Sequence, residues 1–452
     1  MERGLRVTIG RRRLLGLGLG ALGAAALAAC APPGANPVNS EPVIPAAAPG
    51  EKITLTYWAW LKDLQKVCDI WNAKNPNVQV EAVFSLGGSS GGYQKMYSAL
   101  AAGGGPDLAQ VELRTVPEFM LVGGLVDLSR YGAKQYASRY DEAAWGQVNF
   151  NGGVYAIPQD TGPMGWYYQP EVLAKVGGQP PATWDEWAQL AEALHKKDPS
   201  VYLESFSVAD ASPFMSYAAQ AGAKWFTPTD NGWVVNLTDD ASLTAARFFD
   251  KAVDNQWVQT AYDAYSPGWT AAAGNGQIAA LTGASWGDAL VETIGTGSGK
   301  WKVAPMPRWS GGFGSTALGG SSSAVLANSK HPKEAMDFAV WMTTSQEGVD
   351  AMIKYCGIGW SPARDYIGAQ RQQPSEFFSG QNYNTEVFVP AAKEQPTDWH
   401  WGPITQRMLN TLSDNFRLKL TAGQSFVDSL HKTQQTTVDI LRQIGLTVQE
   451  AK

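Results

Sequence analysis

The sequence predicts an α/β fold divided between two domains, and three observations lead to this prediction. The chain has 452 residues, more than one hydrophobic core usually organises, so two domains are the default. Between Ile53 and Val111, segments with strand alternation take turns with segments of helical spacing. This order is typical of a parallel sheet with helices on both faces. The late part of the chain is mostly helical by its pattern.

The first elements follow from the spacing of apolar residues. Leu61, Leu64, Val67, Cys68 and Trp71 recur at helical spacing. The expected order is a strand over 53–58, a helix over 61–71 ended by Asn75 and Pro76, a strand over 78–84, a helix around 93–100, and a short strand ending at Val111.

Later helices are marked by a capping signal and by periodicity. Thr183 and Glu186 form a capping box, in which the Thr183 hydroxyl accepts from the Glu186 amide while Glu186 reaches back. This helix should run through Leu194. Helical spacing predicts four more, over 239–257, 331–343, 404–420 and 424–444.

The N-terminus predicts export. Residues 1–13 carry five arginines, and 14–29 form an uncharged run that ends in Ala28-Ala29-Cys30. A basic region, a short apolar run and small residues indicate a signal peptide over 1–29. The run is shorter than the roughly 20 residues that span a bilayer; an uncleaved anchor is the alternative. The end of the run resembles the bacterial lipoprotein cleavage box, in which Cys30 would be lipidated. Arg11–Arg13 resembles a twin-arginine export motif, although signals with three arginines also use the general secretory route.

Composition limits the partners of the mature chain. Residues 30–50 form a Pro-rich segment with one charge, expected to act as a semi-extended tether. Without residues 1–29 the chain keeps 30 basic and 40 acidic residues, a net charge of −10. That charge argues against nucleic acid or anionic lipid as partners. Cys68 and Cys356 are too few for a metal site; two separate buried thiols are favoured over a disulfide, which stays open.

The tryptophans suggest a binding surface. All eighteen follow residue 57, and many stand in predicted loops beside Gly, Pro, Asp or Asn. Indole faces stack on the C–H patches of sugars, whose hydroxyls need carboxylates and amides around them. More than half should nevertheless pack in their own domain, among them Trp71, Trp187 and Trp341.

One segment carries a family resemblance. Residues 151–158 read NGGVYAIP and 180–187 read PPATWDEW. They resemble the signature of family 1 extracellular solute-binding proteins, the sugar-binding lipoproteins of ABC importers. Gln169 departs from the asparagine usual in that family. Similar matches occur at 105–107, 124–128, 281–286, 303–307 and 328–338, and the resemblance runs from about Ile53 to the C-terminus.

The resemblance implies a two-lobed fold, of the type II periplasmic-binding-protein class and similar to maltose-binding proteins, with a hinge and a cleft. The implied crossings lie near Gln159 to Met164, Lys302 to Pro307, and Thr343 to Gly348. The N-terminal lobe would take 51–160 and 304–345, and the C-terminal lobe 161–303 and 346–452. Such proteins close by hinge bending, and a ligand favours closure only by contacting both lobes.

The resemblance also implies ligand contacts from both lobes, with aromatic residues stacking and charged residues recognising hydroxyls. Trp286 matches the family's sugar-stacking tryptophan. For Arg114 and Lys62 the alternative to ligand recognition is a surface ion pair that contributes little to stability. From the first lobe the expected contacts are Trp60, Lys62, Glu112, Arg114, Gly319 and Gly320. From the second lobe or the hinge they are Asp160, Asp210, Phe214, Trp286, Asp288, Trp360, Trp399 and Trp401.

The expected function is that of a monomeric, membrane-tethered receptor. It would capture a carbohydrate, pass it unaltered to an ABC permease, and need no cofactor or metal. The number of loop tryptophans favours an oligosaccharide over a free hexose. Two alternatives stay open. One is a secreted glycan hydrolase or lyase that uses two carboxylates such as Glu112 and Asp288. The other is a receptor for a polyamine, metal chelate or phosphodiester.

Overall fold

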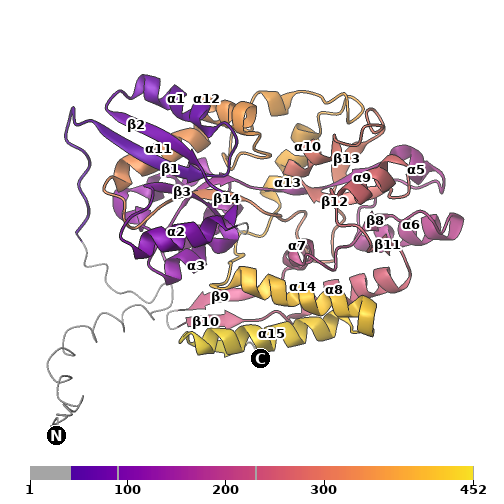
Figure 1. The fold of residues 1–452 in the computed structure, drawn as a ribbon. Coiled ribbons are helices and arrows are strands. Elements are labelled where there is room, and N and C mark those ends of the chain that lie inside the picture. The colour runs from indigo at the N-terminus through magenta and orange to yellow at the C-terminus, as the bar shows by residue number, and fades with distance from the viewer. Residues whose placement is uncertain (1–41, 89–90, 230–231, 451–452) are drawn as a thin grey trace, which may run out of the picture.

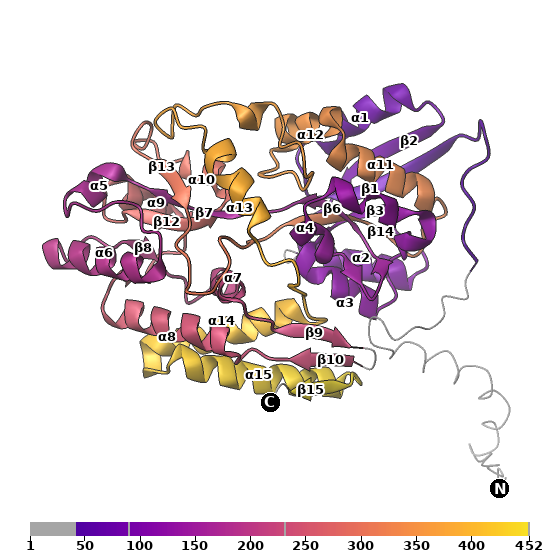
Figure 2. The same cartoon turned by 180° about the vertical axis from the view of Figure 1, so that it is seen from behind.

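The structure is a computed structural model that describes residues 42–88, 91–229 and 232–450 (Figure 1). The expected signal peptide, Cys30 and most of the expected tether lie outside the described residues. The elements lie in two lobes, with the first sheet in one and the smaller sheets mostly in the other (Figures 1 and 2).

The first lobe is organised around one mixed sheet. Among the described residues, five strands form it in the order β2-β1-β3-β14-β6. β1 is parallel to β2 and β3, whereas β14 is antiparallel to both β3 and β6. The carboxyl ends of four strands and the start of β14 therefore meet at one edge. The strands are β1 (Ile53–Ala59), β2 (Val78–Phe84), β3 (Leu108–Glu112), β6 (Ile157–Asp160) and β14 (Ser321–Val325).

Helices cover this sheet because each has one apolar face. In α1, Leu64, Val67 and Cys68 are buried at helical spacing. The edge of Phe338 in α11 meets Tyr57 of β1 at 6.3 Å between ring centroids. The helices of this lobe are α1 (Leu64–Lys74), α2 (Gly92–Ala101), α3 (Val116–Leu121), α4 (Glu142–Gly146), α11 (Pro332–Thr344) and α12 (Gln346–Ala351). A small hairpin, β4 (Asn149–Phe150) and β5 (Gly153–Val154), completes it.

The last residues of the expected tether pack on the first lobe. The amide of Ile44 donates to the Tyr131 hydroxyl at 3.1 Å, and that of Ala47 donates to Glu334 Oε1 at 2.6 Å. Backbone hydrogen bonds to a folded surface fix this stretch despite its composition. Residues 44–47 of the expected semi-extended tether therefore lie against the first lobe.

The second lobe contains an antiparallel sheet in which, within the described part of the chain, three strands pair in the order β12-β7-β13. These are β7 (Met164–Tyr168), β12 (Ala280–Ala284) and β13 (Lys302–Pro305). Shorter strands are β8 (Glu204–Ser205) paired with β11 (Val258–Gln259), and β9 (Phe226–Thr229), β10 (Gly232–Val235) and β15 (Val448–Glu450).

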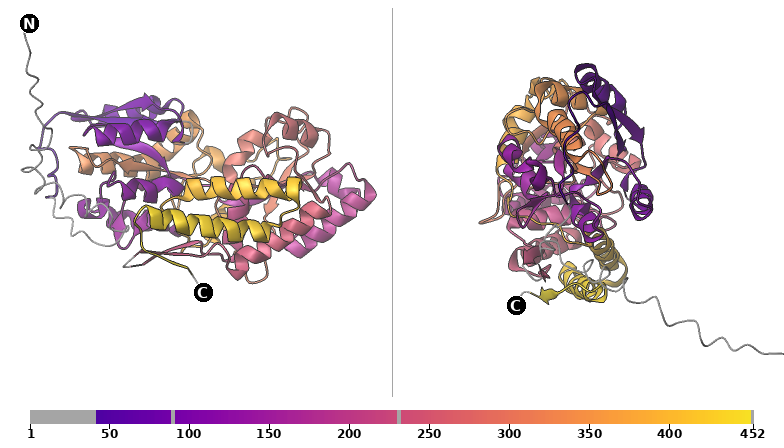
Figure 3. Two further views of the ribbon diagram at one scale, coloured as in Figure 1. Left: turned by 60° about the horizontal axis from the view of Figure 1, so that its bottom comes forward. Right: turned by 90° about the vertical axis from the view of Figure 1, so that its left-hand side faces the viewer.

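Helices surround these strands. α14 and α15 pack against each other along the molecule (Figure 3). At the start of α6 the Thr183 hydroxyl accepts from the Glu186 amide at 3.1 Å, as predicted. Glu186 itself accepts from Ala182 rather than Thr183. The helices are α5 (Pro170–Ala174), α6 (Trp184–Lys197), α7 (Ser212–Ala221), α8 (Asp240–Asp254), α9 (Pro267–Gly274), α10 (Asp288–Val291), α13 (Val389–Lys393), α14 (Thr405–Ala422) and α15 (Phe426–Gln443).

The chain crosses between the lobes at positions that differ in part from the expected ones. The first crossing lies between β6 and β7, in the expected interval. β13, however, still pairs with β7, so the chain returns to the first sheet only between Pro305 and Ser321. α12 and the following π-helical turn, Met352–Cys356 (η7), contact α1. These turns, which follow residue 345, therefore pack on a helix of the first lobe.

Three further findings concern the described residues alone. Cys68 and Cys356 are both free, and burial raises the pKa of each thiol to about 12. No grouping of His, Cys, Asp and Glu there could hold a metal ion. None of the helices there has the length and apolar character needed to cross a bilayer.

Candidate functional site

A cavity of about 240 Å³ opens at the edge of the first sheet where the strand ends meet. We call it the sheet-edge cavity. Its walls come from the ends of β1, β3 and β6, the start of β14, the turn after β12 and the segment after η7. The residues are Trp60, Leu61, Gln110, Glu112, Asp160, Thr161, Trp286, Gly320, Ser321, Gly357, Ile358 and Gly359.

Glu112, the last residue of β3, supplies one of the two carboxylates. It forms an ion pair with Arg114 at 2.8 Å, and the Tyr93 hydroxyl donates to it at 3.2 Å. The same hydroxyl accepts the Glu112 amide at 2.8 Å. These contacts fix the carboxylate at the cavity wall, and Arg114 acts through Glu112 rather than as a separate lining residue.

Asp160, the last residue of β6, supplies the second carboxylate. The amide of Ser321 donates to its Oδ1 at 2.9 Å and the Ser321 hydroxyl donates to its Oδ2. Burial raises the pKa of Asp160, and the hydrogen bonds from Ser321 oppose that rise. This carboxylate keeps free lone-pair directions beyond those that Ser321 occupies.

Trp286 brings the second lobe to the cavity. It follows β12 in a short turn, and its indole Nε1 donates to the Leu318 carbonyl at 2.8 Å. Glycine backbones enclose its ring. A methyl group added at Gly162 would lie 2.7 Å from the indole Nε1, and one at Gly359 would lie 2.1 Å from Trp286 Cβ. Only residues without a Cβ allow the close approach at Gly162 and Gly359. At Gly319 a methyl group would lie 3.5 Å from the same nitrogen, an ordinary contact, and glycine suits this position because of its φ of +75°.

Trp60, the residue directly after β1, also lines the cavity. Its ring meets Tyr93 edge-on at 6.4 Å, and its amide donates to the Gln110 side chain at 3.1 Å. The cavity lining thus includes an indole from each lobe and two carboxylates. Such a set suits a neutral ligand with apolar faces and hydroxyl groups.

The structure places several other predicted contacts away from this cavity. Lys62 is exposed and outside its lining, whereas Phe214, Trp360, Trp399 and Trp401 are buried in packing contacts. Phe214 lies edge-on to Phe416, for example, at 5.0 Å.

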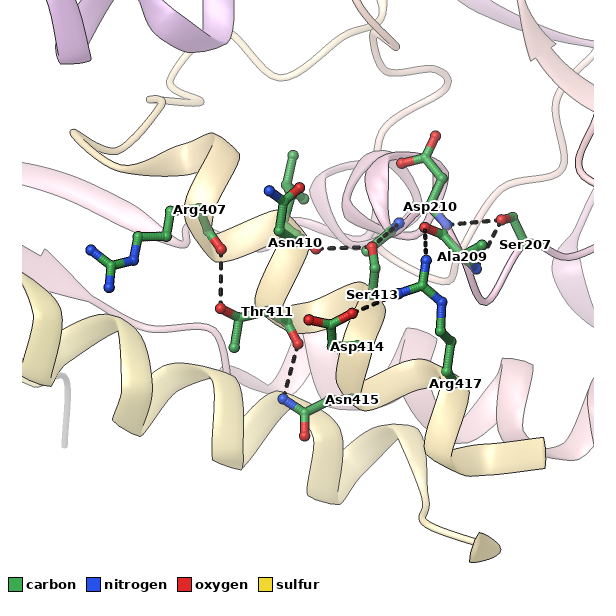
Figure 4. A network of polar contacts seen from close by, with 12 residues as sticks. Ser207, Ala209, Asp210, Arg407, Asn410, Thr411, Ser413, Asp414, Asn415 and Arg417 are labelled. Atoms are coloured by element: carbon green, nitrogen blue, oxygen red, sulfur yellow. Dashed lines mark hydrogen bonds and ion pairs between the residues drawn. The ribbon is translucent and has the colours of Figure 1, made fainter. Parts of the chain in front are cut away.

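Asp288 and Asp210 also have local partners. Asp288 is buried, where it pairs with Arg371 and accepts from the Tyr383 hydroxyl at 2.6 Å. Asp210 is exposed beside the start of α7 and accepts from the Ser212 amide at 2.9 Å. Figure 4 shows its carboxylate directed away from α14. The pair Glu112 and Asp288, considered above for glycan cleavage, does not meet in the sheet-edge cavity, because Asp288 is outside its lining.

A second cavity, of about 340 Å³, lies where the first lobe meets α13, and we call it the Asp141 cavity. Trp360 reaches it, as do Arg364, Asp365 and Lys393. Burial raises the pKa of Asp141 to about 7, while Arg364 and Lys393 lower it and Asp365 raises it. Trp399 and Trp401 border a separate small void of about 20 Å³, large enough for a water molecule.

Sequence reasoning missed several lining residues. Gln110, Thr161, Ser321 and Gly357–Gly359 carried no motif that would single them out. The available signal was position: Gln110 lies inside the predicted strand that ends near Glu112, and Ser321 directly follows the predicted Gly319 and Gly320.

Comparisons with known proteins show the family and the fold. The family model described as "Bacterial extracellular solute-binding protein" matches residues 50–349. The chain is 24% identical to a lactose-binding protein of Rhizobium radiobacter, over 80% of this chain and 87% of the relative. It is 22% identical to an arabinooligosaccharide-binding protein of Halalkalibacterium halodurans, over 81% and 84%. Among solved structures, the galacto-N-biose-/lacto-N-biose I-binding protein of a Bifidobacterium longum ABC transporter, in complex with lacto-N-biose, is 29% identical. Its TM-score is 0.77, with 88% of this chain and 100% of that one covered.

Proposed function

Because the chain belongs to the bacterial extracellular solute-binding proteins, we propose that it captures a carbohydrate for import in the sheet-edge cavity. The observation that carries the proposal is that Trp60 and Trp286, one from each lobe, line the same cavity as Glu112 and Asp160. A sugar between them would contact both lobes and so favour the closed form. The sugar-binding relatives support the same ligand class.

The proposed ligand is an oligosaccharide. The cavity is smaller than the roughly 300 Å³ at which pockets for drug-sized ligands begin, so it would hold about one sugar unit. Beside it, β2 ends at the same sheet edge, since Ala59 and Phe84 are paired. Phe84 is 68% exposed and Leu86 58% exposed. These apolar side chains would support the next unit.

We further propose that the protein is a monomeric lipoprotein, held outside the cytoplasm by a lipid on Cys30, that delivers its ligand unaltered to ABC permease subunits. Replacing Cys30 by Ser should move the protein from the membrane fraction to the soluble extracytoplasmic fraction. Retention of the Cys30→Ser variant in the membrane would contradict lipid anchoring.

Isothermal titration calorimetry tests ligand capture. The panel is lactose, lacto-N-biose, β-1,6-galactobiose, arabinooligosaccharides, and the corresponding monosaccharides. At least one oligosaccharide should bind with a micromolar or lower Kd and be recovered intact by chromatography. Trp60→Ala and Trp286→Ala should weaken binding at least tenfold, whereas Trp341→Ala, a half-buried tryptophan packed on Trp71, should not. Cleaved sugar would support the glycan-active alternative, and tight binding of monosaccharides alone would refute the oligosaccharide.

A further inference from the structure

A connected set of polar side chains lies under the floor of the sheet-edge cavity. Gln110 of β3, Gln159 of β6 and Ser321 of β14 are buried, and all three meet at the Ser321 hydroxyl beside Asp160. Buried polar groups are costly unless satisfied, so the direction of each hydrogen bond can be worked out from its neighbours.

The backbone sets the direction of the first bond. The Trp60 amide lies 3.1 Å from the Gln110 side chain and can only donate, so the oxygen Oε1 of Gln110 must face it. The amide nitrogen Nε2 of Gln110 then faces Ser321 Oγ, to which it donates at 3.1 Å.

The Ser321 hydroxyl is thereby fully used. Its oxygen accepts from Gln110 and, at 3.2 Å, from Nε2 of Gln159, which fills both lone pairs. Its one hydrogen is left for Asp160 Oδ2, while the Ser321 amide donates to Oδ1. Each oxygen of Asp160 therefore receives one hydrogen from Ser321, and the Gln159 side chain adds a further stabilising hydrogen bond. A carboxylate has about four accepting positions, so it can still accept from a ligand in the cavity.

We propose that Ser321, oriented by Gln110, is the positioning residue that holds the Asp160 carboxylate as a hydrogen-bond acceptor on the cavity floor. The cavity then selects a sugar unit that offers hydroxyl donors at this point. The inference rests on the proposed function, since it specifies how the same cavity recognises its ligand.

The chemistry of Asp160 makes this role measurable. Burial raises the pKa of Asp160, and the nearby charge of Glu112 raises it as well. Glu112 is itself paired with Arg114, and Lys62 is exposed outside the lining. The hydrogen bonds from Ser321 are the largest effect in the other direction. Without the Ser321 hydroxyl the pKa should rise further, and the carboxyl should become protonated, hence a donor, at a higher pH.

The test compares Ser321→Ala with Ser322→Ala. Ser322 is the next residue of β14 and is also buried, and its hydroxyl donates to the Val111 carbonyl at 2.9 Å rather than to Asp160. Affinity for lactose, lacto-N-biose and β-1,6-galactobiose is measured by calorimetry from pH 5 to pH 8, with the melting temperature of each variant. Both variants should melt lower than the parent protein.

Of the two variants, only Ser321→Ala should bind the sugar at least about tenfold more weakly at pH 7, because it loses the hydrogen bond from the Ser321 hydroxyl to the Asp160 carboxylate. Its loss of affinity on acidification should also begin at a higher pH than in the parent protein. Ser322→Ala should keep the parent affinity and pH profile. Parent-like affinity and pH profile in Ser321→Ala would overturn the proposal.

A ligand-free measurement separates this inference from the proposed function. The carboxyl ¹³C resonance of Asp160 is titrated in the parent protein and in both variants. Its midpoint should rise in Ser321→Ala and stay unchanged in Ser322→Ala. If no sugar binds but the midpoint rises, the proposed function fails and the positioning role stands; an unchanged midpoint refutes the role. If Ser321→Ala does not fold, Gln110→Met takes its place, because it removes the amide that orients Ser321. This variant should also raise the titration midpoint of Asp160, and an unchanged midpoint would refute the positioning role.

Discussion

Replacing Gly359 by Ala tests how Trp286 is held at the sheet-edge cavity. A methyl group at position 359 would lie 2.1 Å from Trp286 Cβ, 2.3 Å from its Cα and 2.9 Å from its amide nitrogen. Carbon atoms in contact prefer about 3.5 to 4 Å, so the two segments must separate by about 1 Å or more. The clash involves backbone atoms, and a rotation of the indole cannot relieve it.

The size of the effect follows from this geometry. Overpacking of a well-packed site costs about 1 to 3 kcal/mol, and a backbone clash belongs at the upper end. Moving Trp286 should also break its hydrogen bond to Leu318 and misplace the indole against a sugar. An aromatic contact worth about 1 kcal/mol corresponds to a loss of affinity of about five- to tenfold.

Chemical denaturation and calorimetry measure the two effects separately. The control is Gly295→Ala, since a methyl group there meets nothing within 4 Å and the residue is not in a left-handed conformation. The control should stay within about 0.5 kcal/mol of the parent free energy of unfolding and keep its affinity. If Gly359→Ala matches the control in both measurements, Trp286 is not held by close backbone packing.

Three further predictions concern residues away from the cavity. Asp141 has a raised pKa of about 7 when folded, so the folded state binds more protons than the unfolded state above pH 4 and loses stability as pH rises toward 7. Asp141→Asn should remove about 2 to 4 kcal/mol of this pH-dependent loss of stability, so that the plot of unfolding free energy against pH becomes flatter. An unchanged slope would contradict the raised pKa of Asp141. Arg371→Leu should cost about 3 to 5 kcal/mol in urea unfolding, because it leaves Asp288 buried without its cation and removes a hydrogen bond to the Ile358 carbonyl. An unfolding free energy within about 0.5 kcal/mol of the parent would contradict this account of the ion pair. Phe214→Ala should lower the free energy of unfolding in urea by about 3 to 5 kcal/mol and leave sugar affinity unchanged, as expected of a core residue. A small loss of stability with a large loss of affinity would contradict its place in the core.

The first elements of the fold were predictable because the signals that define them are local. β1, α1, β2 and α2 begin and end within a few residues of the predicted bounds. Alternation, helical spacing and the stop at Asn75 and Pro76 all act within one element. Trp60 and Glu112 could be predicted as site residues from their position at the ends of predicted strands, since ligands collect at the carboxyl ends of strands.

Exposure could not be predicted in the same way. Phe214 and Asp288 have the residue types of a binding site, yet one lies in an aromatic core and the other in a buried ion pair. A residue type states which contacts are favourable. Whether those contacts are made with a ligand or with the protein depends on what the fold brings beside them.

The sequence by itself determined the local elements of the chain, its family resemblance, and the indoles and carboxylates from which a site could be assembled. Only the tertiary structure decided which of them meet. Gln110 and Ser321 are 211 residues apart, and they touch because β14 inserts antiparallel between β3 and β6. Periodicity acts between neighbours in the chain, whereas sheet order is set by the burial of whole faces. The floor of the cavity is therefore a property of the folded sheet.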